Sequence, residues 1–159
     1  MAHNKQLITS FYNAFANNDI QKMAECYHEN IQFQDPAFGI LYGKEPIIMW
    51  KMLLERSKGN IKIEFFDVEA HENSGSVIWI ATYVFSKTNR KVVNKINTKF
   101  EFQDGLIIKH TDTFDIYKWA KQALGFKGFL LGWTSFMKNK IQEGAKKSLE
   151  IYIKNQTKV

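Results

Sequence analysis

The sequence predicts an α+β protein in the element order ααβαββββ, with further helices at its end. Two observations support this fold class. Apolar residues recur at helical spacing over the first 27 residues, and from residue 60 onward apolar and polar residues alternate between short turn sequences. A chain of 159 residues fits one ordinary domain. We expect that domain at 1-115, with 116-159 as a helical, basic extension packed on it.

Two helices open the chain and predict an αα-hairpin. Asn17-Asn18-Asp19 supplies the turn between them and the N-cap of the second helix. The apolar positions that recur at helical spacing are Leu7, Ile8, Phe11, Phe15, Ile20, Met23, Ala24 and Tyr27.

A short strand follows the hairpin, because Ile31, Phe33 and Asp35 alternate onto one face. Pro36 stops this strand. A loop with two glycines then leads into a helix of roughly residues 44 to 57.

Four further strands predict an antiparallel meander, at about residues 60 to 71, 76 to 87, 91 to 103 and 107 to 115. The strand at 76 to 87 is apolar on both faces, since Val77 and Trp79 alternate with Ile78 and Ile80. Both faces should therefore be covered. The helices would cover one face, and a second copy of the chain would cover the other in a homodimer.

The last strand carries the strongest candidates for chemistry. His110, Asp112 and Phe114 share one face, because successive strand residues point to opposite sides. Asp35 is a second acid that could meet them. Asp115 lies on the opposite face and should cap the helix that begins after it.

The element order, the helical hairpin, the Phe33-Gln34-Asp35-Pro36 turn and the four-strand meander resemble the nuclear transport factor 2-like superfamily, especially its SnoaL-like and ketosteroid-isomerase-like branches. The resemblance covers about residues 3 to 115. It implies a cystatin-like cone, in which a curved sheet wraps around the helices and leaves a deep apolar pocket. It also implies isomerase, cyclase, dehydratase or epoxide hydrolase chemistry, or ligand binding without catalysis.

The ketosteroid-isomerase-like resemblance assigns the catalytic base to Asp35, which precedes a proline as that family's base does. That family's oxyanion hole uses a tyrosine and a protonated aspartate. The best-matched positions here are Phe11 and Thr98, which departs from the pattern. Tyr12 is one residue away, and we expect it to point elsewhere because one helical step turns a side chain by about 100°.

Two other branches give different implications. Epoxide hydrolase chemistry implies an Asp-Arg-Asp set, but Arg56 and Arg90 lie at a helix end and in a turn, so we expect neither in the pocket. SnoaL-like cyclases resemble this chain in having acid and histidine positions on the last strand.

Each catalytic candidate keeps an alternative. Asp35 is a general base or a turn carboxylate, with the two interpretations about equally supported. His110 and Asp112 act as acid or orienter, or form a hydrogen-bonded pair that plugs the pocket floor. The predicted ligand-binding residues are Phe11, Tyr12, Phe15, Trp79, Thr98, Phe100 and Phe114. Their aromatic character favours a hydrophobic ligand.

No metal site or cofactor is expected. His3, His28, His71 and His110 show no metal-binding spacing, and the sequence has no glycine-rich phosphate loop. The lone cysteine, Cys26, excludes an intrachain disulfide and is given no role. The N-terminus lacks the hydrophobic stretch of a secretory signal, so we expect a cytoplasmic protein.

The basic character of the chain belongs to its tail, which has nine lysines and two glutamates from residue 116 onward. We weigh three interpretations. The tail is a lid or packing arm, which we favour, or an anionic-membrane contact, or a nucleic-acid contact, for which no specific motif is present. The membrane contact would use Phe126, Phe129, Leu130, Leu131 and Trp133.

The sequence thus predicts a protein that binds a small hydrophobic molecule in an apolar pocket, with acid/base catalysis as one form of this function. The alternative is a noncatalytic ligand-binding or membrane-associated accessory protein.

Overall fold

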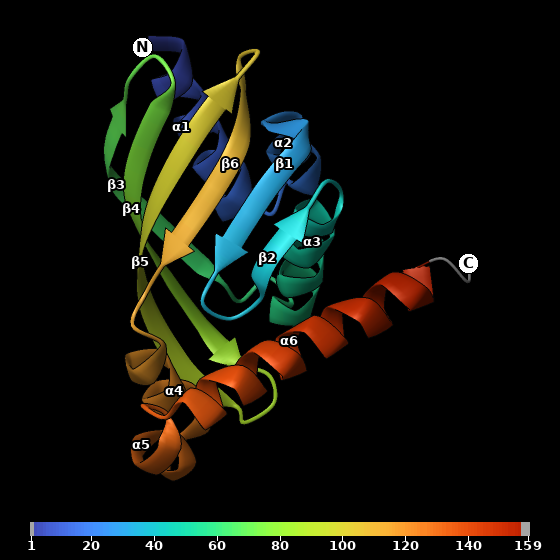
Figure 1. The fold of residues 1–159 in the computed structure, drawn as a ribbon, viewed down its shortest axis with the longest axis vertical. Helices are drawn as coiled ribbons and strands as arrows, with labels where there is room; N and C mark the ends of the chain where they lie inside the picture. Colours follow the sequence, from blue (N-terminus) through green and yellow to red (C-terminus); the bar gives the residue numbers. More distant parts are fainter. Residues whose placement is uncertain (1, 157–159) are drawn as a thin grey trace.

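One curved, six-stranded sheet organises residues 2–156, the part of the chain that the computed structural model describes (Figure 1). Helices α1 (Ala2–Ala16), α2 (Ile20–Glu25) and α3 (Glu45–Ser57) lie on one side of it. Three more helices follow the sheet. The α+β prediction is confirmed. The strands are β1 (Tyr27–Asp35), β2 (Gly39–Tyr42), β3 (Lys62–Ala70), β4 (Ser74–Phe85), β5 (Arg90–Gln103) and β6 (Leu106–Thr113).

The strand order is β2-β1-β6-β5-β4-β3, and only β1 and β6 pair in parallel. This pairing brings the end of β1 beside the end of β6, so Phe33 lies opposite His110. The short strand that follows the helical hairpin therefore pairs with the last strand of the meander, inside the sheet. Their side chains can share one site.

Strand β2 corrects the expectation of a loop before α3. Gly39 and Gly43 have positive φ angles of 70° and 59°, which suits glycine and turns the chain at both ends. Leu41 between them pairs with Phe33 and is buried at 5% exposure. Gly39 and Gly43 therefore mark the two ends of a short hairpin strand, whereas the sequence pattern predicts a loop there.

The inner face of the sheet packs against α1 and α3. Strand β5 shows the alternation clearly, because its inward residues are buried while most of its outward residues are exposed. Each large apolar side chain buried in this way contributes roughly 1.5–3 kcal/mol to stability. The largest fully buried side chains include Tyr12, Phe11, Phe15, Phe33 and Phe100.

The outer face of β4 is only partly covered within a single chain. Ile78 and Ile80 are partly buried, and Val84 is 47% exposed. Phe66 and Val93 on the neighbouring strands are 40% and 43% exposed. The expectation that a second copy of the chain covers this face stays a prediction.

Helix α4 (Ile116–Leu124) begins as predicted, because Asp115 Oδ1 accepts a hydrogen bond from the backbone N–H of Lys118 at 2.9 Å. The helix packs on the far end of β5. Gln122 both accepts from the backbone N–H of Val93 and donates to its carbonyl. Val92, Trp119, Ala120 and Ala123 form a small second core there.

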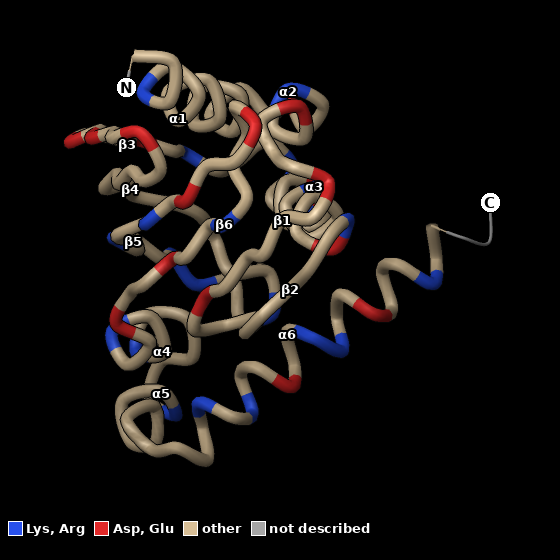
Figure 2. The backbone as a smooth tube through the Cα atoms, turned by 45° about the horizontal axis from the view of Figure 1, so that its top comes forward, with Lys and Arg blue, Asp and Glu red and all other residues tan. Residues whose placement is uncertain are grey.

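Helix α6 (Ser135–Gln156) crosses the open end of the fold and bonds to two separate elements (Figure 1). Gln142 Nε2 donates to the carbonyl of Pro36 at 3.2 Å. Further along, the Tyr152 hydroxyl donates to Glu55 Oε2 at 2.6 Å. Lysines follow α6 along its length (Figure 2). The division of the chain at residue 115 stays a prediction.

Helix α5 (Phe126–Leu131) was not expected and lies tightly against α4. A Cβ atom added at Gly128 would come within 1.9 Å of the Ala120 carbonyl oxygen. One added at Gly132 would come within 2.9 Å of the Ala120 Cβ. These glycines let the two helices approach more closely than any side chain would permit.

No helix among residues 2–156 is long and apolar enough to cross a bilayer. The cytoplasmic location stays a prediction.

Two glycine-to-alanine substitutions should have opposite effects on stability. Gly128→Ala forces a methyl group into the backbone of α4 and should lower the free energy of unfolding by about 2 kcal/mol or more. Gly144→Ala is the matched control in α6, where the nearest atom is Lys87 Nζ at 4.0 Å. It should raise stability by up to about 1 kcal/mol through helix propensity. Urea denaturation of both variants tests this, and equal effects would contradict it.

Candidate functional site

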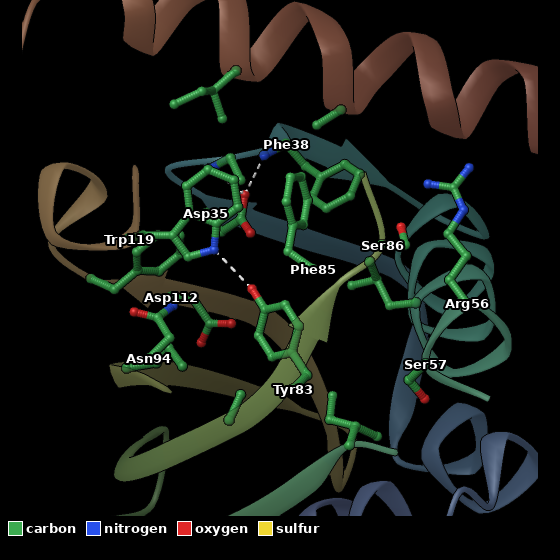
Figure 3. Close-up of a pocket in the computed structure, with 18 of the residues that line it drawn as sticks. Asp35, Phe38, Arg56, Ser57, Tyr83, Phe85, Ser86, Asn94, Asp112 and Trp119 are labelled. Atoms are coloured by element: carbon green, nitrogen blue, oxygen red, sulfur yellow. Dashed lines mark hydrogen bonds between the residues drawn. The ribbon is translucent and has the colours of Figure 1, made fainter. Parts of the chain in front are cut away.

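A cavity of about 270 Å³ lies between the inner face of the sheet, α3 and α6 (Figure 3). Most of its surface is apolar, with Phe15, Trp79 and Phe114 among its walls. The volume is close to the lower limit of known ligand pockets, so a small molecule would fill it. Asp35 and Asp112 are the acidic residues in its lining.

Asp35 combines the two interpretations that the sequence left open. Its Oδ1 accepts hydrogen bonds from the backbone N–H groups of Ala37 (3.0 Å) and Phe38 (2.5 Å), which holds the turn between β1 and β2. The same carboxyl lines the cavity. It is therefore a turn residue that is also placed to meet a ligand.

The apolar surroundings make Asp35 hold its proton unusually tightly. The pKa of this carboxyl is raised to about 7, chiefly by burial and in smaller part by the negative charge of Asp112. The backbone N–H groups of Phe38 and Ala37 act against this rise. A group with a pKa near 7 can both give and take a proton at neutral pH.

Asp112 is 4% exposed and is held by two neighbours. Its Oδ1 accepts a short hydrogen bond from the Thr98 hydroxyl and a second from His110 Nε2 at 3.0 Å. Thr98 lies directly opposite Asp112 in the pairing of β5 with β6. The carboxyl is therefore fixed in place at the cavity wall.

The first relay that reaches Asp112 begins at Trp50. Trp50 Nε1 lies 3.0 Å from the Tyr27 hydroxyl, which lies 2.8 Å from His110 Nδ1. An indole N–H can only donate, so the Tyr27 oxygen accepts from Trp50. The donor between Tyr27 and His110 Nδ1 depends on the tautomer of the imidazole, and an N–H at Nε2 donates to Asp112.

The second relay uses the same logic. Trp79 Nε1 donates to Thr98 Oγ1 at 2.9 Å, and the single hydrogen of Thr98 goes to Asp112. The Tyr12 hydroxyl lies 3.2 Å from the same Oγ1 and must donate to it. Both relays therefore end on one carboxylate oxygen.

The structure brings together two of the three predicted catalytic residues. Asp35 and Asp112 line the same cavity, whereas His110 is fully buried behind Asp112 and does not line it. The role of His110, as acid, as orienter or as part of a hydrogen-bonded pair with Asp112, stays a prediction. His110 and Asp112 form a direct hydrogen bond, which their spacing along the strand permits.

The orientation expected for Tyr12 is wrong. Its side chain is fully buried and its hydroxyl reaches Thr98, although Phe11 beside it is fully buried too. The reason is that the apolar stripe of a helix commonly spans 100° or more, so α1 buries two successive residues. Phe11 packs on Tyr27 and Trp50, whereas Tyr12 packs on other rings of the sheet.

The predicted ligand-binding residues separate into two groups. Phe15, Trp79 and Phe114 line the cavity. The remaining four are buried in the core around it, and they are Phe11, Tyr12, Thr98 and Phe100.

Arg56 corrects the expectation that neither arginine belongs to the pocket. It lines the cavity from the end of α3. Figure 3 shows it on the opposite side from Asp35 and Asp112, so it does not form the Asp-Arg-Asp set of the epoxide hydrolase branch.

The sequence pattern places Tyr83 among the residues that line either the pocket or the core, and it gives no role to Trp119. The Tyr83 hydroxyl accepts from Trp119 Nε1 at 2.8 Å, and both residues line the cavity (Figure 3). Burial raises the pKa of Tyr83, and the charge of Asp35 adds to this rise. The periodicity of β4 placed Tyr83 on the inner face, but the approach of α4 could be found only from the folded chain.

Replacing Asp35 by asparagine should change how stability depends on pH. Because the folded-state pKa lies above that of an unfolded aspartate, the contribution of Asp35 is fully present at low pH and is lost as pH rises from about 4 to about 7. Asp35→Asn keeps the Oδ1 acceptor and removes the charge. We expect this variant to be more stable than wild type by about 2 kcal/mol at about pH 8. Urea denaturation across this pH range measures it, and parallel pH profiles would contradict it.

The family model for the SnoaL-like domain matches residues 8–110, which is more than half of the chain. The match ends before α4 begins. The comparison with curated proteins found no match.

Solved structures share the fold at low sequence identity. TerC, co-crystallised with polyporic acid, has a TM-score of 0.67 at 14% identity and covers 77% of this chain and 99% of its own. Bal32a, from a soil-derived mobile gene cassette, has a TM-score of 0.68 at 21% identity and covers 77% of this chain and 97% of its own. An LEH-like epoxide hydrolase from M. tuberculosis has a TM-score of 0.61 at 20% identity and covers 82% of this chain and 94% of its own. These likenesses show the fold alone.

The resemblance drawn from the Phe33-to-Pro36 turn and the strand meander is confirmed, together with the nuclear transport factor 2-like cone. This chain belongs to the SnoaL-like domain family.

Proposed function

We propose that the protein binds a small hydrophobic molecule in the cavity and transfers a proton on it, with Asp35 as the base. One observation carries the proposal: a carboxyl with a pKa of about 7 lines an apolar cavity beside a second, firmly held carboxyl. The co-crystal of the similar protein TerC with polyporic acid supports a hydrophobic ligand.

The reaction that suits these groups is proton abstraction next to a carbonyl. The ionised fraction of Asp35 would take the proton from carbon, while the Tyr83 hydroxyl donates a hydrogen bond to the oxygen that gains charge. Tyr83 can do so because its oxygen accepts from Trp119, which leaves its own hydrogen to donate. Return of the proton to another carbon gives isomerisation, and attack of the enolate carbon on a second carbonyl gives cyclisation.

Asp112 and His110 would then act on Asp35 and not on the ligand's carbon. The charge of Asp112 keeps the proton affinity of Asp35 high, and the relay through His110 holds Asp112 in place. We propose His110 as a positioning residue. Phe15, Trp79 and Phe114 would contact the apolar body of the ligand.

The second candidate is a noncatalytic binding protein, which the small, mostly apolar cavity also suits. The two candidates differ in what removal of the Asp35 charge does. Asp35→Asn removes the catalytic base and should abolish proton transfer. The same substitution should leave binding in an apolar site intact.

Deuterium exchange measures the proposed activity directly. With β-tetralone in deuterium oxide, wild-type protein should speed the loss of the α-proton signal in proton NMR. Asp35→Asn should reduce that enhancement by about 100-fold or more. Asp19→Asn is the matched control, because Asp19 is a partly exposed N-cap outside the cavity.

Binding of the neutral dye N-phenylnaphthylamine, followed by fluorescence, separates the candidates. Dye binding without exchange would favour the noncatalytic protein. Exchange that survives in Asp35→Asn would remove Asp35 from the role of base.

We also propose a homodimer that uses the outer face of the sheet. Phe66, Val84 and Val93 are exposed there, beside the partly buried Ile78 and Ile80. Sedimentation should give a dimer at micromolar concentration, and Val93→Lys should shift it toward monomer. Wild-type protein that sediments only as a monomer would end this proposal.

A further inference from the structure

An apolar ridge stands out from the surface at α5 and the start of α6. Its members are exposed by 44% to 74%, although large apolar side chains are usually buried. They follow one another within a short segment and are Phe126, Phe129, Leu130, Leu131, Trp133 and Phe136.

The direction of the ridge is set by glycine packing. Phe126 and Phe129 are three positions apart in α5 and so lie near each other on its surface, and Trp133 follows in the turn before α6. Gly128 and Gly132 lie against Ala120 of α4. The aromatic residues cannot turn inward, because the space under α5 admits no side chain at Gly128.

The charge around the ridge has one sign. Residues 116 to 142 contain five lysines and neither aspartate nor glutamate. Lys140 Nζ lies 5.1 Å from the ring of Phe136, and Lys121 Nζ lies 4.4 Å from the ring of Tyr117. Positive groups therefore flank the exposed apolar side chains.

We propose that this ridge docks the protein on an anionic membrane surface. Its aromatic side chains enter the interface of the bilayer, and the lysines contact acidic head groups. A second copy of the chain fits this surface less well, because a two-fold contact would place the lysines of one ridge against those of the other. Acidic lipid supplies both the apolar layer and the opposite charge.

The lid and the membrane contact, which the sequence presented as competing interpretations, use different parts of the tail. Ala145 and Gly144 of α6 line the cavity, while none of the ridge residues does. Lys140 belongs to both regions, since it lines the cavity and packs on Phe136. The cavity mouth would therefore lie close to the lipid surface when the protein is docked.

Vesicle flotation tests the proposal. Wild-type protein should float with vesicles of phosphatidylcholine and phosphatidylglycerol at low salt, and much less with phosphatidylcholine alone. About 1 M salt, where the Debye length is about 3 Å, should release it. The triple variant Phe126→Ser, Phe129→Ser, Trp133→Ser should lower the bound fraction about tenfold. Ile40→Ser with Tyr42→Ser, which changes exposed apolar residues of β2 outside both the ridge and the proposed dimer face, should bind as wild type does.

Tryptophan fluorescence gives an independent readout. Trp133 is 67% exposed, whereas Trp50, Trp79 and Trp119 are buried. Anionic vesicles should shift the emission to shorter wavelength, and Trp133→Phe should remove the shift.

Absence of flotation at low salt, or flotation that the ridge substitutions leave unchanged, would overturn the proposal. So would a ridge-dependent change from dimer to monomer in sedimentation, because it would assign the surface to a second copy.

Discussion

The hydrogen bonds that converge on Asp112 Oδ1 organise the interior of this protein. The inner face of the sheet is apolar and rich in aromatic rings, so a carboxyl there is costly unless it is paired. Thr98 and His110 supply the pairing, and Trp50 and Trp79 stand at the outer ends of their relays. Among residues 2–156, no fully buried side-chain N or O atom lacks a hydrogen-bond partner. The relays tie β1, β4, β5, β6, α1 and α3 to one point, which gives the core a single arrangement.

The candidate site takes its character from the contrast between two carboxyls. Asp112 accepts hydrogen bonds from two side-chain donors. Asp35 uses one carboxyl oxygen to accept from the backbone of a turn, and the rest of its surroundings are mostly apolar. The two carboxyls thus differ in their surroundings: hydrogen-bond donors hold Asp112 in place, whereas the pKa of Asp35 is raised mainly by burial. The parallel pairing of β1 with β6 is what brings them to the same wall.

Local patterns predicted most of the fold, because the amphipathic periods of α1, α3 and the strands match their burial. Strand β2 was missed because two glycines look like a loop until Leu41 is seen paired with Phe33. In the site, Asp35 could be predicted from the turn that Pro36 makes, and Asp112 from the alternation of residues along the last strand. The approach of Trp119 to Tyr83 could not be predicted, because 36 residues separate them and only tertiary packing brings them together. The orientation of Tyr12 could not be predicted from its position next to Phe11, because the buried face of a helix can be wide enough to include two successive residues.

The bond from Gln142 to the Pro36 carbonyl links a wall of the cavity to the turn that carries Asp35. Residues Ile141, Ala145 and Ser148 of α6 also line the cavity, so the helix contributes both to the shape of the site and to the burial of that carboxyl. Burial is the largest cause of the raised pKa of Asp35. The wall that encloses a ligand is therefore also part of the apolar surroundings that raise the proton affinity of the carboxyl beside it.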